Sequence, residues 1–443
     1  MRRPFSGFTS AGFCILKHMN ARNAACREQG AGVSLSVAAG TEPVVRPACR
    51  WSDTLLRLGG TLFALSLFST KTGLDTSVWV LSVGALRCVV WGRRDVLAVP
   101  AVARFLRWSA CFLAVAVIAS FGSPDPVSSW KRLVILLGYF GVFFAVVLVD
   151  ERRLQFVSRI LVFACVVECL LAVAQAAGVP WVSRPVSFTA GRRGMGTLGS
   201  PNDLGAALGV FIPMLTAYLW RTPSRRSRMI AGSALMLVGA GLVATQMRGA
   251  WVAVFVALMV MGAIGSRRLL AGVLVGAAIA LAVPFVYARV SSTLANPEHT
   301  RISFLRTVPR FVSRRPVFGW GLDTFKKVYY AEHPDPQGRE HFHPHNTFLN
   351  IAFQVGLVGL LCFVGMLWSL GASAWMAAAS PTPTRRWIGW GAVGALTAFT
   401  VIGLFDEPFR AYQAPYLLYA VFGLVLRGDV SVTPRRDAVC RPL

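Results

Sequence analysis

The chain has 443 residues, of which 55% are hydrophobic and 14% are charged, and its formal net charge is +26. A soluble domain carries roughly 25% charged residues, so this composition excludes an ordinary soluble protein. Such a basic soluble protein would suggest nucleic acid as a partner. No nucleic-acid partner is expected here, because the cytoplasmic loops of membrane proteins collect Lys and Arg.

The first 53 residues are basic and polar and contain no clean signal peptide. We expect residues 1–53 to be a disordered, basic cytoplasmic leader, or the product of a start codon assigned too far upstream. Nine cysteines are present, and none falls in the two long outer loops predicted below. The sequence therefore predicts neither a disulfide framework nor a cysteine-based zinc site.

About twelve apolar runs approach the roughly 20 residues that a helix needs to cross a bilayer. Only helices satisfy their own backbone in lipid over such runs. The expected fold is therefore all-α, a polytopic integral membrane protein in which residues 54–287 hold nine spans, 347–426 hold three, and 427–443 form a cytoplasmic tail. The predicted spans are 54–70, 76–92, 107–122, 132–149, 159–178, 202–220, 229–247, 249–265, 269–287, 347–370, 387–405 and 413–426.

Arginines recur in every second loop between these spans, which predicts that both termini are cytoplasmic. Two outer loops remain, at 179–201 and 288–346, and the second is the one large periplasmic loop. Both are basic, which opposes the usual orientation bias and indicates an anionic ligand. Within the large loop, residues 301–315 are expected to form an amphipathic helix on the membrane surface, ended by Pro316. Its predicted apolar face consists of Ile302, Leu305, Val308 and Val312.

A histidine-rich run leads from this loop into a span, with His341, His343, His345 and Asn346 in order. A neutral imidazole at position 345 could accept a proton from a hydroxyl near neutral pH. The alternative is an interfacial histidine that only makes hydrogen bonds. Asn346 could cap the helix or orient the ring, and His343 is a rival for the chemical role.

The same histidines, with His333 and Asp335 nearby, could instead bind zinc. Pro344 and the absence of a cysteine ligand or a helical HExxH spacing weigh against that interpretation. No metal and no other cofactor is therefore predicted.

Three arginines reach the predicted outer side from separate parts of the chain, namely Arg193, Arg248 and Arg301. Guanidinium groups bind phosphates in bidentate geometry and stay charged at any physiological pH, which favours a pyrophosphate ligand. Arg248 could also be only a snorkelling anchor. The run from Arg193 to Asn202 and the helix N-terminus that follows could offer backbone N–H groups to a phosphate, or the run could be only a turn.

Two sets of acidic or polar residues also stand near the predicted spans. Glu168 and Gln175 share a helix face, and we expect them to form an internal hydrogen-bonded pair. Asp406 and Glu407 follow an outer helix end, where they could pair with Arg410 or with a site arginine.

The run His345-Asn346, nine residues, then Gly356-Leu-Val-Gly359 resembles the signature of the bacterial O-antigen ligase and polysaccharide polymerase superfamily. The glycines of this run also suit close helix packing. Three further segments are similar to its pattern: Gly196-Thr-Leu-Gly-Ser-Pro-Asn202, Gln246-Met-Arg248-Gly-Ala, and Arg301 followed by Pro316-Val-Phe-Gly319-Trp-Gly321.

The resemblance implies a GT-C-like, inverting, metal-independent glycosyltransferase of the bacterial inner membrane, with its site facing the periplasm. Its donor would be a glycan on undecaprenyl pyrophosphate, and its acceptor a hydroxyl of lipid A–core. A polysaccharide polymerase, a protein O-oligosaccharyltransferase and, less favoured, a transporter of lipid-linked sugars remain alternatives.

By the same resemblance His345 would activate the acceptor hydroxyl, while Arg193, Arg248 and Arg301 would stabilise the leaving pyrophosphate. Arg306 and Arg289 are secondary candidates, and Arg192 could take the place of Arg193. The supporting residues would be Asn202, Asn346, Gly356, Gly359 and His343.

Overall fold

The computed structural model describes most of the chain beyond residue 47. The described residues are 48–69, 71–91, 93–180, 182, 193–295, 299–334, 343–409 and 413–432. For residues 48–50, 290, 292–295, 299–301 and 431–432 only the backbone is described. Most of the expected leader, as well as Arg184, Arg192, His341 and Arg410, lies outside this part of the chain.

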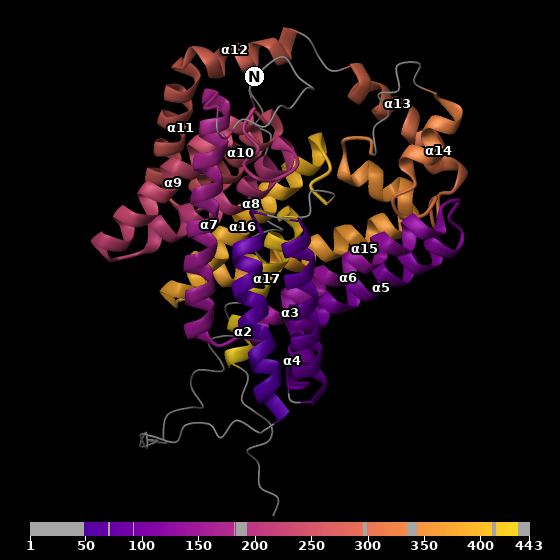
Figure 1. The fold of residues 1–443 in the computed structure, drawn as a ribbon, viewed down its shortest axis with the longest axis horizontal. Helices are drawn as coiled ribbons and strands as arrows, with labels where there is room; N and C mark the ends of the chain where they lie inside the picture. The colour runs from indigo at the N-terminus through magenta and orange to yellow at the C-terminus, as the bar shows by residue number, and fades with distance from the viewer. Residues whose placement is uncertain are drawn as a thin grey trace, which may run out of the picture. The chain divides into compact units, whose positions relative to one another are not determined.

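The described chain is helical throughout and contains no strand, as the hydropathy pattern predicts (Figure 1). Every predicted span falls on a helix. These helices are α2 (Ala48–Ser66), α3 (Lys71–Trp91), α5 (Pro100–Phe121), α6 (Pro126–Leu148), α7 (Glu151–Ala177), α8 (Pro201–Arg221), α9 (Arg225–Thr245), α10 (Arg248–Gly265), α11 (Arg267–Ala282), α15 (Thr347–Ala378), α16 (Pro383–Phe405) and α17 (Gln413–Val432). Four shorter helices complete the chain, α4 (Asp95–Ala98), α12 (Pro284–Ala295), α13 (His299–Arg314) and α14 (Phe325–Glu332).

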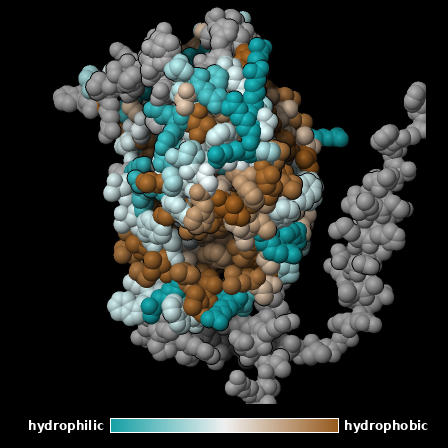
Figure 2. Space-filling view, turned by 90° about the vertical axis from the view of Figure 1, so that its right-hand side faces the viewer, coloured by the Kyte–Doolittle hydropathy of each residue, from teal (hydrophilic) through white to brown (hydrophobic). Residues whose placement is uncertain are grey.

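Within the described residues, 9 helices are long and apolar enough to cross a membrane. The expected spans on α2, α11 and α17 are not among them. The predicted span 269–287 is also interrupted, because α11 ends at Ala282 and Pro284 opens a new helix. Broad hydrophobic areas cover one face of the molecule, with hydrophilic residues gathered mainly in its upper part (Figure 2). The structure therefore supports a polytopic membrane protein, while the count of twelve spans stays a prediction.

The core of the bundle is built around α8 and α16. All residues of α8 from Leu204 to Ala217 are buried, and α8 packs against α9, α10, α16 and α17. α16 also contacts α15. Both helices lie in the middle of the ribbon, whereas α11 and α12 lie at its edge (Figure 1). The central helices bring the ends of α8 and α16 into position for the site described below.

The segments predicted to lie outside the membrane meet at one end of the bundle. Thr197 donates to the carbonyl of Ser69 at 2.6 Å, and Ser129 donates to the carbonyl of Leu322 at 2.8 Å. Arg315 donates to the carbonyl of Gly122 at 2.9 Å. Segments far apart in sequence are thus grouped as the alternation of arginine-rich loops predicts.

The segments predicted to be cytoplasmic also contact one another. Arg385 pairs with Asp429, and Arg427 donates to the carbonyl of Val149. Arg153 lies 3.5 Å from Asp53. Both groupings are expected if successive spans alternate in direction, because every second loop then lies on the same side.

Helix α15 is broken at Gly356, where φ is +71° and ψ is −176°. The turn that follows Pro316 docks into this break through backbone hydrogen bonds. Trp320 N donates to Phe353 O and Gly321 N to Gln354 O, each at 2.9 Å. Leu357 N in turn donates to Pro316 O at 2.7 Å. The turn thus supplies partners for backbone groups that a broken helix would leave unsatisfied.

Helix α13 covers the outer part of α15 together with α14. It ends at Arg314, just before Pro316, as expected. The predicted apolar face is only half right, because Ile302 and Leu305 are exposed. The buried face consists of Phe304, Val308, Phe311 and Val312, which pack on Phe325, Tyr329 and Phe353. The predicted face left out the aromatic residues. Phe304 and Phe311 are buried, so they determine which face of α13 packs against α14 and α15.

The substitution Gly356→Ala is expected to lower the melting temperature of the purified protein. A Cβ at this position would lie 2.2 Å from Val317 O, and its φ of +71° is one that alanine rarely adopts. Strain of this kind costs about 1–3 kcal/mol. The matched control is Gly239→Ala on α9, where a Cβ meets nothing within 4 Å. An alanine there is expected to stabilise the helix by about 0.5–1 kcal/mol. Equal melting temperatures for the two variants would contradict the docking of the turn.

Candidate active site

His345 lies at the junction between the outer segment and α15, in a backbone conformation that is rare for a residue with a side chain. Its φ is +52°, in the left-handed region. Asn346 caps α15, as predicted, by accepting a hydrogen bond from Leu349 N at 2.9 Å. Its amide also donates to Leu404 O at 3.1 Å, which ties the start of α15 to the end of α16. Strained residues held in this way cluster at functional sites.

The imidazole of His345 is held by Asp406. Its Nδ1 lies 3.1 Å from Asp406 Oδ1, and the two side chains are only 16% and 11% exposed. The ring also stacks on Phe304 of α13, with centroids 6.4 Å apart. The carboxylate therefore fixes the position of the imidazole through its Nδ1 atom.

Asp406 is also bonded to α8, which extends the site toward Arg193. Asn202 Nδ2 donates to Asp406 Oδ2 at 3.1 Å. Asn202 Oδ1 accepts from Arg193 at 2.8 Å, and Arg193 Nε donates to Thr245 O at 2.9 Å. Arg193, Asn202, Asp406 and His345 thus form one connected series of hydrogen bonds, which we call the Arg193–His345 series. Sequence analysis placed Asp406 at an outer helix end but did not identify it as the partner of His345.

Glu168 and Gln175 have a different role from the internal pair that was expected. Gln175 Oε1 accepts from Met195 N and Gly196 N, each at 2.9 Å. Glu168 Oε2 accepts from Thr197 N at 2.7 Å. Both side chains therefore hold the segment that carries Arg193, so the expectation of a mutual pair is wrong.

The same bonds bear on the glycines at 194 and 196. A Cβ at Gly194 would lie 2.2 Å from Ala172 O, and one at Gly196 would lie 1.8 Å from Glu168 Oε2. The glycines let this segment approach α7, and its N–H groups at 195, 196 and 197 are donated to protein acceptors. These three N–H groups are therefore not offered to a phosphate, while an anion site at the start of α8 stays a prediction.

The remaining predicted arginines lie on three helices, α10, α12 and α13. Arg248 is the first residue of α10, three residues after Thr245, whose carbonyl binds Arg193. Arg301 lies on α13 one turn before Phe304, which stacks on His345. The Arg301 side chain lies outside the described part of the structure. Arg306 is exposed on the same helix, and Arg289 lies on α12.

His343 lies beside His345, with ring centroids 4.6 Å apart, and its Nδ1 accepts from His345 N at 3.3 Å. Ligand atoms of His343, His345 and Asp406 lie within 4.8 Å of one another. These three groups could hold a metal ion, in a combination different from the histidine set considered above. The donor set of two imidazoles and one carboxylate suits zinc.

Gly356 and Gly359 were expected to allow close helix packing. A Cβ at Gly359 would lie 2.3 Å from Val355 of the same helix and 3.4 Å from Val115 on α5, which is an ordinary contact distance, so the packing role of Gly359 stays a prediction. Gly356 instead opens α15 for the turn after Pro316. The two sequence motifs, the histidine-to-glycine run and the Pro316–Gly321 segment, therefore form one structural unit.

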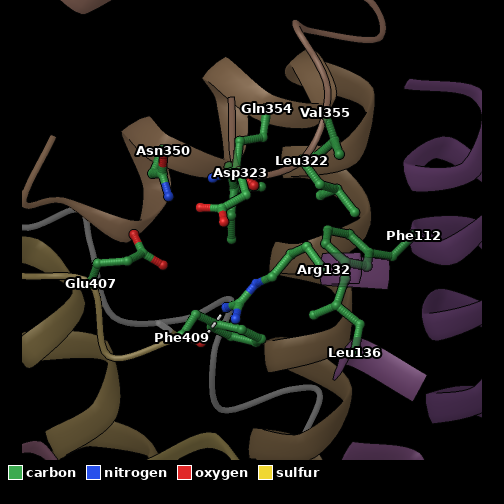
Figure 3. A pocket seen from close by; sticks show the side chains of 11 residues that line it. Phe112, Arg132, Leu136, Leu322, Asp323, Asn350, Gln354, Val355, Glu407 and Phe409 are labelled. Atoms are coloured by element: carbon green, nitrogen blue, oxygen red, sulfur yellow. Dashed lines mark hydrogen bonds between the residues drawn. The ribbon is translucent and has the colours of Figure 1, made fainter. Parts of the chain in front are cut away.

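A cavity of about 30 Å³, with a mainly apolar lining and a few charged side chains, lies next to the series and was not predicted. Figure 3 shows Arg132, Asp323 and Glu407 pointing into it from α6, the turn before α14 and the segment after α16. Arg132 donates to Phe409 O. Glu407 Oε2 is buried and makes no hydrogen bond within the described residues. Because Glu407 follows Asp406 directly, the cavity adjoins the residue that holds His345.

The buried carboxyl of Glu407 is expected to make stability depend on pH. Burial raises its pKa to about 7 from an ordinary value of 4.5, while Arg132 acts in the opposite direction. A raised pKa means that the folded protein binds the proton more tightly than the unfolded chain. Its stabilising contribution is complete below pH 4.5 and is lost as the pH rises through about 7.

Melting temperatures measured from pH 4 to 8 should therefore fall with rising pH more steeply in the wild type than in Glu407→Gln. The glutamine keeps the shape and cannot ionise. Parallel curves for the two proteins would show that Glu407 does not titrate in this window.

Comparison with known proteins agrees with the geometry. Residues 233–364 match the family described as O-antigen ligase. No curated protein matches the chain. The matched segment contains His345 and Gly356, as well as Arg248 and Arg301. Arg193, Asn202 and Asp406, which are joined to His345 by hydrogen bonds, lie outside the matched segment. Residues 233–364 are therefore similar to the O-antigen ligase family, and the apolar helices support an integral membrane protein.

Proposed function

We propose that this protein is an inverting glycosyltransferase that moves a glycan from undecaprenyl pyrophosphate to a hydroxyl of lipid A–core. The reaction would take place at the periplasmic face of the inner membrane. The observation that carries the proposal is the Arg193–His345 series, which joins a held imidazole to a fixed guanidinium at the end of the bundle.

His345 would serve as the base or orienting group for the acceptor hydroxyl. We propose that the imidazole donates an Nδ1 proton to Asp406 and accepts the hydroxyl proton at Nε2 during the reaction. The hydroxyl oxygen attacks the anomeric carbon from the face opposite the pyrophosphate. The new C–O bond forms as the bond to the pyrophosphate oxygen breaks, and that oxygen takes the electron pair. The configuration at the anomeric carbon is therefore inverted.

Arg193, Arg248 and Arg301 would stabilise the charge that grows on the leaving pyrophosphate. Arg193 is fixed by Asn202 and Thr245, so its charge is positioned before the reaction begins. A guanidinium cannot lose its charge at physiological pH. We therefore propose that the arginines balance the charge of the pyrophosphate, as a metal ion would in other transferases. The pyrophosphate can then leave without protonation by a general acid.

Other functions of the superfamily use the same donor. A polysaccharide polymerase takes a lipid-linked glycan as acceptor, and a protein O-oligosaccharyltransferase takes a hydroxyl of a protein. A transporter of lipid-linked sugars could use the arginines but has no need for a histidine held by a carboxylate. The paired His345 and Asp406 therefore favour a transferase over a transporter.

Complementation of a ligase-deficient Gram-negative host tests this function. Wild-type protein is expected to restore the lipopolysaccharide ladder on gels, and His345→Ala and Arg248→Ala are expected to abolish it. Loss of general-base catalysis alone lowers a rate by about 10²–10⁴-fold. His333→Ala is the matched control, because His333 is an exposed histidine of the same outer region that packs on Tyr329.

Expression of each variant is checked by immunoblot of the membrane fraction. Lipid-linked polymer that accumulates unattached in the wild-type strain would contradict ligation and favour the polymerase. A full ladder from His345→Ala would contradict the proposed role of the imidazole.

A further inference from the structure

A second basic site lies beside the proposed active site, in a groove between the start of α3 and the start of α6. The groove has a volume of about 820 Å³. Lys71, Lys131 and Arg132 contribute three positive charges to its wall, against the single carboxylate of Asp323. None of these residues belongs to the Arg193–His345 series.

The remaining wall of the groove is apolar and follows α6 into the bundle. Val127, Trp130 and Val134 recur at helical spacing along this helix, and all three are exposed. The positive charges therefore lie next to a hydrophobic strip on a helix that is long and apolar enough to cross the membrane. A ligand that carries both a phosphate and a hydrocarbon chain matches this combination.

The groove also connects to the proposed active site. Arg132 and Asp323 line both the groove and the small cavity that holds Glu407. Glu407 is adjacent in sequence to Asp406, the partner of His345. A head group held in the groove would thus be next to the cavity that adjoins the catalytic histidine.

We propose that the groove binds the phosphorylated head group of the lipid acceptor. This inference rests on the proposed glycosyl transfer and assigns its second substrate to the class of phosphorylated lipids. The arginines on the side of α8 and α10 would take the donor pyrophosphate, and the cations of α3 and α6 would take the acceptor phosphate. A protein acceptor would not carry the phosphate and the hydrocarbon chain that the basic and apolar walls of the groove match.

Direct binding to purified protein tests the groove independently of catalysis. The probes are phosphorylated lipid A, lipid A from which the phosphates have been removed, and inorganic phosphate as a competitor. The variant is Lys71→Gln with Lys131→Gln, both exposed side chains whose replacement is expected to leave the fold intact. The matched control is Lys327→Gln, an exposed lysine of the same end of the bundle that does not line the groove.

The double variant is expected to bind phosphorylated lipid A about 30-fold more weakly than the wild type, since each basic residue near a membrane surface contributes about fivefold in affinity. Lys327→Gln should bind as the wild type does, and the dephosphorylated lipid should bind weakly to all three. Equal binding by the double variant and the wild type would overturn the proposal. Competition by millimolar inorganic phosphate would overturn it in favour of a site for free phosphate.

Transfer assays on the same proteins separate the two proposals. The double variant should raise the KM for the lipid acceptor by about 30-fold and leave kcat and the KM for the donor unchanged. A rise in the donor KM instead would reassign the groove to the donor. If the wild type transfers no glycan although phosphorylated lipid A binds through the two lysines, the proposed function fails while the lipid-phosphate site stands.

Discussion

The carboxylate of Asp406 is the contact on which the site depends. One oxygen faces His345 Nδ1 and also accepts the N–H of Glu407, while the other accepts the amide of Asn202. Asn202 connects this carboxylate to Arg193. The hydroxyl of Thr347 donates to the backbone carbonyl of Asp406. Burying a carboxylate costs free energy unless its oxygens accept hydrogen bonds. The partners therefore stabilise the carboxylate, and the carboxylate in turn fixes their positions. The histidine is thereby kept in a left-handed conformation that it would rarely adopt alone.

A second constraint comes from the need to satisfy the backbone inside a bundle of apolar helices. α15 breaks at Gly356, and the turn from Pro316 to Gly321 supplies the missing hydrogen bonds. This docking places α13 and α14 over the outer part of α15, where Phe304 meets the ring of His345. Gly356 is therefore linked to His345 through the docked turn and through Phe304 of α13. This link is consistent with the presence of both residues in one sequence motif.

Hydropathy and arginine spacing were sufficient to predict the helices and the grouping of their ends, because both depend on local composition. The cap at Asn346 was one of two roles expected from its residue type, and it is confirmed because a cap is a contact between neighbours in sequence. The catalytic role of His345 stays a prediction. The partnership of His345 with Asp406 was not predicted, because it joins residues 61 positions apart. The same holds for Glu168 and Gln175, whose partners lie across a tertiary contact with 195–197. The buried face of α13 was misassigned because its aromatic residues were not counted.

The central claim is that His345 and Asp406 act as one catalytic unit, and a double-mutant cycle tests it most directly. Initial rates of glycan transfer would be measured with purified wild type, His345→Ala, Asp406→Ala and the double variant, all at saturating donor. Residues that act as a unit are strongly non-additive. The double variant should therefore be no slower than His345→Ala alone. Losses that multiply across the two positions would contradict the claim, because they would show that each residue contributes without the other.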